Sequence, residues 1–170
     1  MNILPELDNF YRHQLLQGHV HDYAAAMTGG VNGHAGLFSN ANDLAKLLQM
    51  YLNSGKYGKV RYLNSKTLHK FSTCAFCNNN NRRGLGFDRP LRPEGGPSSQ
   101  LVSDKSFGHS GFTGTLVWID PKYDFIYIFL SNRIHPTSEN KKLWKMDVRT
   151  KVQDYFYKSF PDLDTTLLVQ

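Results

Sequence analysis

Apolar residues recur at helical spacing in the first half of the chain, and this pattern predicts two helices. Ser39 or Asn40 can cap the first helix, and Gly55 stands where a helix often ends in the left-handed conformation. The apolar positions of this helix are Leu44, Leu47, Leu48, Tyr51 and Leu52. A second, short helix is predicted to begin at residue 64 or 65, with one apolar face formed by Leu68 and Phe71.

In the second half, the pattern changes to aromatic and β-branched residues, which favour strands. Segments 107–120 and 125–131 are predicted to pair as an antiparallel hairpin, joined by a turn at residues 120–123, and residues 84–88 predict a shorter strand. A last helix, from about residue 138 to residue 160, is suited to cover this sheet. Its apolar stripe consists of Trp144, Val148, Val152, Tyr155 and Phe156.

These elements predict an α/β chain of the α+β type, in which helices cover an antiparallel sheet. The 170 residues fit one domain and can bury roughly two thirds of the surface of the unfolded chain. Residues 1–17 read as a lead-in, 18–38 as a loop rich in Gly, Ala and His, and 161–170 as a loosely held tail. Two polar stretches, 73–83 and 90–100, are expected to be long loops.

The formal net charge of +6 suits a polyanionic partner, but the sequence does not gather its positive residues into one binding segment. The cations are scattered except for one group, which we interpret as a solvated helix face: Lys141, Lys142, Lys145, Arg149 and Lys151. No nucleic-acid partner is therefore predicted. No apolar run reaches the length of a membrane span, and residues 1–10 lack the features of a signal peptide. An export signal, if the protein has one, is expected outside this chain.

Cys74 and Cys77 form a CxxC spacing, which is compatible with a redox pair, half of a zinc site or two incidental thiols. A zinc site needs four ligands, and His69 is the only further candidate nearby in sequence. The βαβ context of a thioredoxin-like motif is also missing. We therefore interpret the two cysteines as incidental.

Three common catalytic or ligand-binding motifs are incomplete. The serine elbow GxSxG is nearly met at residues 108–112, but Phe112 replaces the last glycine and a strand, not a helix, follows. The glycine-rich segment 29–36 lacks the Lys and Ser or Thr that close a phosphate-binding loop. His19 and His21 lack the carboxylate pattern of a metal site. No cofactor and no metal are predicted.

Three segments together resemble the serine β-lactamase and penicillin-binding-protein superfamily, in particular its class C-like members. The segment 33–44 is similar to the family's glycine turn into a capped helix, and 84–88 is similar to the strand before the third active-site motif. His109, Ser110 and Gly111 match that third motif, which has Lys or His, then Thr or Ser, then Gly. The resemblance runs from about residue 18 to residue 160 and implies the C-terminal part of that fold.

The resemblance also implies site residues. His109 would bind a substrate carboxylate or tune the proton relay, and Ser110 would donate to the substrate. Gly111 would let the substrate lie against the strand edge, and the backbone N–H of Phe112 would supply one oxyanion donor. A three-residue motif is short, so the alternative that His109 only begins a strand stays open.

The chemistry of this superfamily needs a Ser three residues before a Lys on a helix, and a Tyr or Ser that relays the proton. Ser138 and Lys141 have the right spacing, and Tyr62 begins an imitation of the relay motif, but all three lie at the wrong place in the chain order. We therefore expect a partial domain whose parent is a serine hydrolase of amides or esters, and which is inactive alone.

The resemblance further implies a cell-wall peptide or small molecule as substrate, the periplasm or cell envelope as location, and the N-terminal part of the same domain as a partner. Self-association is expected, because a missing part would leave a strand edge and apolar surface exposed. The alternative hypothesis is a non-catalytic module that binds a peptide or glycan on the same fold. A nucleic-acid-binding domain is the third and least supported reading.

Overall fold

The computed structural model describes residues 5–77, 81–92 and 95–161. At its centre is a three-stranded antiparallel sheet in the order β5–β6–β7, formed by β5 (Phe107–Ser110), β6 (Leu116–Asp120) and β7 (Phe125–Phe129). The hairpin of β6 and β7 confirms the predicted turn after Asp120. The prediction of one strand over 107–120 was wrong, because a tight turn at residues 111–114, with Gly114 at a φ of +99°, reverses the chain.

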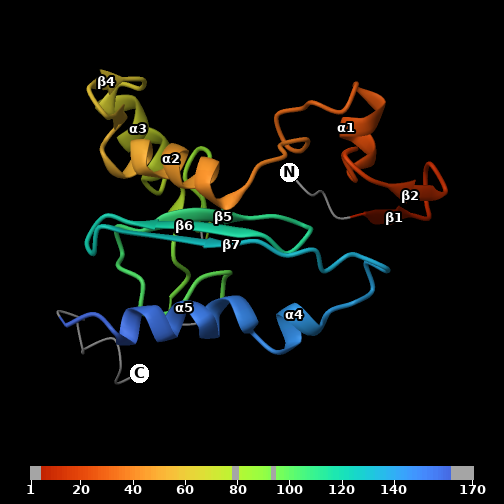
Figure 1. Ribbon diagram of the computed structural model, residues 1–170. Coiled ribbons are helices and arrows are strands. Elements are labelled where there is room, and N and C mark those ends of the chain that lie inside the picture. Colours follow the sequence, from red (N-terminus) through yellow and green to blue (C-terminus); the bar gives the residue numbers. More distant parts are fainter. Residues whose placement is uncertain (1–4, 78–80, 93–94, 162–170) are drawn as a thin grey trace.

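Helices cover this sheet, as the sequence predicted, and the structure places them on both of its faces (Figure 1). On one face, Val117 and Ile119 pack in a cluster with Leu48 of α2 (Ala41–Leu52). On the other face, Leu116 and Trp118 pack in a cluster with Tyr157 of α5 (Val148–Lys158). Alternate residues of β6 thus enter two different cores, as the two-residue period of a strand requires.

A buried carboxylate joins α5 to the sheet. Asp120 is fully buried at the end of β6 and accepts hydrogen bonds from the Tyr157 hydroxyl at 2.8 Å and from the Ser103 amide at 2.7 Å. Burial, together with the adjacent Asp120 carboxylate, raises the pKa of Tyr157 well above its ordinary value. The network stabilises the protonated phenol and holds α5 against the sheet.

The predicted helices of the first half are confirmed. Asn40, not Ser39, caps α2: its side-chain oxygen accepts from the Asp43 amide at 3.0 Å. Gly55 follows the helix in the left-handed region, with a φ of +93°. Asn64 caps α3 (Ser65–Ser72), and the short hairpin of β3 (Lys56–Tyr57) and β4 (Val60–Arg61) connects the two helices.

Two predicted elements differ from the structure. The helix expected over 138–160 is divided into α4 (Lys142–Lys145) and α5, because Asp147 between them has a left-handed φ of +55°. The strand expected over 84–88 is only a turn whose ends form isolated bridges, Arg83 with Asp88 and Asp88 with Gly108. Asp88 still joins this turn to β5, since its N–H and C=O both bond to Gly108.

The lead-in and the following loop contain structure that the sequence did not predict. β1 (Glu6–Asp8) and β2 (Gln14–Leu16) form a hairpin, and α1 (Tyr23–Met27) follows it. These elements lie to one side of the central sheet (Figure 1). Asn132 donates to the Pro5 carbonyl at 3.0 Å and so connects this hairpin to the chain after β7.

Cys74 and Cys77 form a disulfide, so the interpretation as incidental thiols was wrong. None of the helices in the described ranges is long and apolar enough to cross a membrane. In the same ranges, no group of three or more His, Cys, Asp or Glu residues is placed to hold a metal ion. The predicted tail lies outside the described residues, except for Pro161.

Candidate active site

A hollow of about 540 Å³ lies between the glycine-rich loop before α2 and the start of the central sheet. Three segments far apart in the sequence form it: the loop 32–37, the turn 83–86 and β5. None of its lining residues is acidic: Asn32, Gly33, His34, Ala35, Leu37, Arg83, Gly86 and His109. We call this hollow the His109 pocket. Its lining, with a basic side chain and no acidic one, favours anionic over cationic groups.

Of the four residues implied by the resemblance, His109 alone lines the pocket. His109 pairs with Val117 and Ser110 with Leu116 in the register of β5 and β6. Because neighbouring strand residues point to opposite faces, His109 faces the side of α2 while Ser110 faces the side of α5. The structure therefore separates these two side chains. The glycine beside them, Gly108, is required, since a Cβ there would lie 2.2 Å from the Val117 carbonyl oxygen.

Arg83 is a pocket residue that the sequence analysis missed. One of its terminal nitrogens, Nη1, lies 3.3 Å from Nε2 of His109. Its Nε lies 3.4 Å from the carboxylate of Asp88, which is 1% exposed. No sequence motif includes Arg83, and a polar loop gives no periodic signal. Only the bridge from Asp88 to Gly108 shows that this turn reaches the strand with His109.

On the opposite side of the pocket, His34 is paired with Asp22, at 2.8 Å between Nε2 and Oδ1. The hydrogen bond from the Ala25 amide and the contact with His34 lower the pKa of Asp22. The loop around His34 folds tightly: Gly36 has a φ of +111°, and a Cβ at this position would lie 2.2 Å from the Gly30 carbonyl oxygen. A side chain at position 36 would therefore displace the loop that forms this side of the pocket.

Phe112 lies in the turn after β5, outside the lining of the pocket. Its carbonyl accepts a hydrogen bond from Nε of Arg133 at 2.8 Å. Within the described ranges its amide N–H has no hydrogen-bond acceptor, as an oxyanion donor requires before substrate binds. The Phe112 ring stacks on His21, with 5.8 Å between centroids, and burial lowers the pKa of His21. His21 is thus a packing residue in this structure.

The apparent nucleophile motif is not arranged for catalysis. Ser138 lies outside any helix, and its carbonyl accepts from Arg133 at 3.0 Å. Lys141 precedes α4 as its N-cap residue, so the pair does not occupy successive turns of one helix. Tyr62 is 63% exposed before α3. None of these three residues lies in the lining of the His109 pocket.

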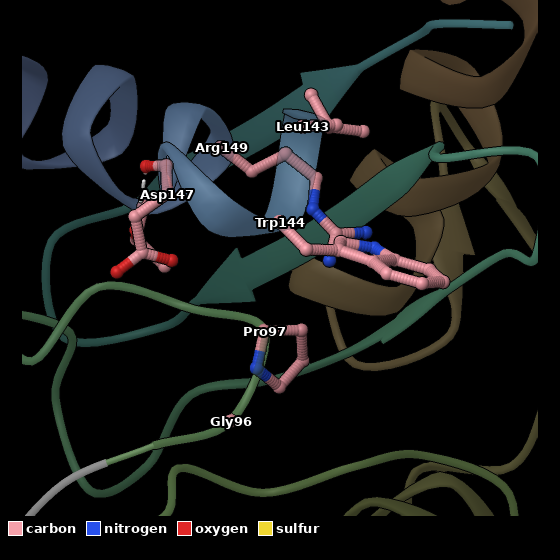
Figure 2. A pocket seen from close by; sticks show the side chains of 7 residues that line it. Gly96, Pro97, Leu143, Trp144, Asp147 and Arg149 are labelled. Carbon is pink, nitrogen blue, oxygen red and sulfur yellow. Dashed lines mark hydrogen bonds between the residues drawn. The ribbon is translucent and has the colours of Figure 1, made fainter. Parts of the chain in front are cut away.

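A second, smaller pocket of about 220 Å³ lies where α4 meets α5 (Figure 2). Trp144 and Arg149 point into the same space, opposite Gly96 and Pro97 of the preceding loop. Arg149 also approaches the sheet, with 3.5 Å between Nη1 and the Thr115 carbonyl oxygen. His109 does not line this pocket, so we place the candidate active site at the His109 pocket.

Helices cover an antiparallel sheet, a His-Ser-Gly strand lies at the edge of this sheet, and a glycine-rich turn precedes α2. Together these features are typical of the fold of penicillin-recognising serine hydrolases. The family model named Beta-lactamase matches residues 4–149. The chain therefore belongs to the β-lactamase family, which confirms the resemblance seen in the sequence.

Proteins named D-alanyl-D-alanine carboxypeptidase are close relatives. The chain is 39% identical to one from Escherichia coli K12 over 137 residues, which cover 77% of this chain and 30% of the relative. It is also 39% identical over 137 residues to one from Salmonella typhi, covering 78% and 31%. The chain thus spans less than a third of the length of these relatives.

A solved β-lactamase from Mycobacterium bovis has the same fold in part. Its TM-score to this chain is 0.55 at 21% sequence identity, and the match covers 73% of this chain and 45% of the other. This likeness confirms the predicted α+β fold class.

Proposed function

We propose that this chain forms one side of the active site of a serine hydrolase that cleaves amides or esters through an acyl-enzyme. In this proposal the nucleophilic Ser and its Lys belong to another part of the protein, and the 170 residues alone are inactive. The observation that supports it is the His109 pocket, in which the motif strand and a cationic side chain meet without a serine nucleophile. Among the described residues, the neighbouring Phe112 amide donates no hydrogen bond, which suits an oxyanion donor in acyl transfer.

We further propose a substrate that ends in a carboxylate, such as a cell-wall peptide ending in D-alanyl-D-alanine. Two observations support this class: the pocket has Arg83 and no acidic lining residue, and relatives are named D-alanyl-D-alanine carboxypeptidases. A guanidinium and a carboxylate can form two parallel hydrogen bonds, which gives both affinity and orientation. Such a substrate places the protein in the periplasm or cell envelope.

The test is covalent labelling with a fluorophosphonate, which reacts with activated serines, followed by intact mass measurement. We expect no adduct on this chain. In the E. coli relative we expect one adduct, on a serine outside the region that aligns with this chain. An adduct on Ser110 or Ser138 would contradict the proposal, because this chain would then contain its own activated serine.

A non-catalytic binding module is the alternative, and one observation favours it: the lining of the His109 pocket includes Arg83 and two histidines but no serine. The labelling experiment separates the two functions. Under the alternative, the E. coli relative stays unlabelled while a peptide ending in D-alanyl-D-alanine still binds, as measured by calorimetry. Labelling of the relative would exclude the alternative for that protein.

A further inference from the structure

We propose that Arg83 is a positioning residue that sets the tautomer of His109. In the neutral imidazole this contact places the proton on Nδ1 and directs the lone pair of Nε2 at the guanidinium. The permanent positive charge of the pair is that of the Arg83 guanidinium. The role of this pair in catalysis rests on the function proposed above, but the pair itself is a property of this chain.

The tautomer follows from the chemistry of the two groups. The contact joins Nη1 of Arg83 to Nε2 of His109 at 3.3 Å. A guanidinium has only donors, so the imidazole nitrogen in this hydrogen bond must accept. An accepting Nε2 bears no proton, and a neutral imidazole therefore has its proton on Nδ1.

Arg83 is held in place by a buried carboxylate. Asp88 is 1% exposed and contacts two consecutive arginines: Arg82 through Nη1 at 2.7 Å and Arg83 through Nε at 3.4 Å. The Arg83 amide also donates to the side chain of Asn81 at 3.0 Å. Nε and Nη1 of one rigid guanidinium thus face Asp88 and His109 respectively, which fixes the direction of the donor.

Asp88 also fixes the position of His109, through hydrogen bonds to the preceding residue. Its amide donates to the Gly108 carbonyl at 2.7 Å, and its carbonyl accepts from the Gly108 amide at 3.0 Å. Gly108 directly precedes His109 in β5. One residue therefore positions both members of the pair, through its side chain for Arg83 and through its backbone for His109.

The consequence concerns how the pocket meets a ligand. The resemblance gives the first position of the motif the role of a cation or donor, and here those roles are divided between two residues. Arg83 supplies the charge that an anionic ligand meets, while His109, whose Nε2 accepts from Arg83, keeps its Nδ1–H as a donor on the strand. Arg83 is 56% exposed at its side chain, so a ligand can reach it without a change in the fold.

The experiment is ¹⁵N NMR of the histidine rings in the intact chain, at about pH 8, where an ordinary histidine is neutral. Correlations between ring nitrogens and carbon-bound protons distinguish a protonated from an unprotonated nitrogen. We expect the wild-type His109 to be protonated at Nδ1. In Arg83→Leu, which removes the donor, we expect the proton to move to Nε2 in most molecules.

Arg82→Leu is the matched control, because Arg82 contacts the same carboxylate but not His109. It is expected to leave the tautomer of His109 unchanged. Protonation of Nε2 in the wild type would overturn the proposal, and so would the same tautomer in wild type and Arg83→Leu. If a variant does not fold, the wild-type spectrum still tests the tautomer itself, because protonation of Nε2 would contradict the proposal. This readout does not depend on catalysis, so failure of the labelling experiment and failure of this inference are distinct results.

Discussion

The guanidinium of Arg133 lies 3.8 Å from the centre of the Trp144 ring and thereby connects α4 to the turn after β5. The guanidinium also lies 4.6 Å from the centroid of the Phe112 ring, and its Nε donates to the Phe112 carbonyl. A further nitrogen, Nη1, donates to the carbonyls of Ser138 and Asn140. Arg133 is 6% exposed, and its burial lowers its pKa from the ordinary value. Arg133 therefore holds the turn at residues 111–114, which contains the candidate oxyanion donor, the amide of Phe112.

Arg133→Met is expected to lower the free energy of unfolding by about 2–4 kcal/mol, because three part-buried carbonyls lose their charged donor and two cation–π contacts disappear. Urea unfolding followed by circular dichroism measures the change. Lys151→Met, at an exposed position of α5, is the control and is expected to change stability by less than about 0.5 kcal/mol. Equal stability of the two variants would show that Arg133 does not hold the turn.

The sequence predicted the central sheet and its covering helices because those elements have strong local signals. The period of apolar residues defined α2, cap residues placed the starts of α2 and α3 to within one residue, and aromatic and β-branched residues marked β6 and β7. The break between α4 and α5 has no such signal. It depends on a left-handed Asp147, a conformation that propensity does not predict in an apparently continuous amphipathic segment.

The candidate site was predicted only in part, for a related reason. His109 was found because it lies in a motif on a strand with a clear pattern. Arg83 and His34 were missed because they lie in polar or glycine-rich segments whose positions are set by tertiary contacts, namely the bridge from Asp88 to Gly108 and the pair of His34 with Asp22. Single-sequence reasoning detects local periodicity and cannot detect such contacts.

Asp8 makes the N-terminal hairpin sensitive to acid. Burial alone would raise its pKa, but hydrogen bonds from the Tyr11 amide, the Arg12 side chain and the Phe10 and Arg12 amides lower it far below the ordinary value. The Arg12 Nε is 2.6 Å from the carboxylate. As pH falls, the unfolded chain takes up this proton first, so the stabilisation is present above about pH 4 and is lost progressively at lower pH.

The measurement is urea unfolding of wild type and Asp8→Asn between about pH 7 and pH 3. We expect the variant to be less stable at pH 7 and the difference to shrink as pH falls below 4. Asp104→Asn, at a side chain that is 88% exposed, serves as the control and should track the wild type. A difference between wild type and Asp8→Asn that stays constant over this range would contradict the assignment.

The disulfide of Cys74 and Cys77 lies beside the turn that contains Arg83. The Cys74 sulfur is 3.5 Å from the Asn81 carbonyl oxygen and 3.8 Å from that of Arg83. Because the closed loop is short, reduction should lower the free energy of unfolding by at most about 2 kcal/mol. Its main effect is expected to be local, as faster amide exchange at residues 81–83 with unchanged protection in β6.

Maleimide labelling followed by mass spectrometry provides the matching chemical test of this disulfide. We expect no label on the native protein and two labels after reduction. Cys74→Ser/Cys77→Ser should reproduce the exchange pattern of the reduced protein. Two labels before reduction would show that the thiols are free, and slower folding of the whole sheet in the double variant would show a global role in place of the local one.

The outer edge of β7 leads to a prediction about self-association. Among the described strands β7 pairs with β6 alone, although helices cover both faces of the sheet. The strand consists of five apolar or aromatic residues without charge or proline, which is the kind of edge that pairs with another chain.

We expect this edge to produce concentration-dependent dimers in size-exclusion chromatography with light scattering. Leu130→Lys, which places a charge directly after β7, should shift the equilibrium toward monomer, whereas Val31→Ser, at a residue far from this edge in sequence and 85% exposed, should not. A monomer at all concentrations would show that this edge is protected in solution, and would contradict the expectation that the chain associates through uncovered sheet.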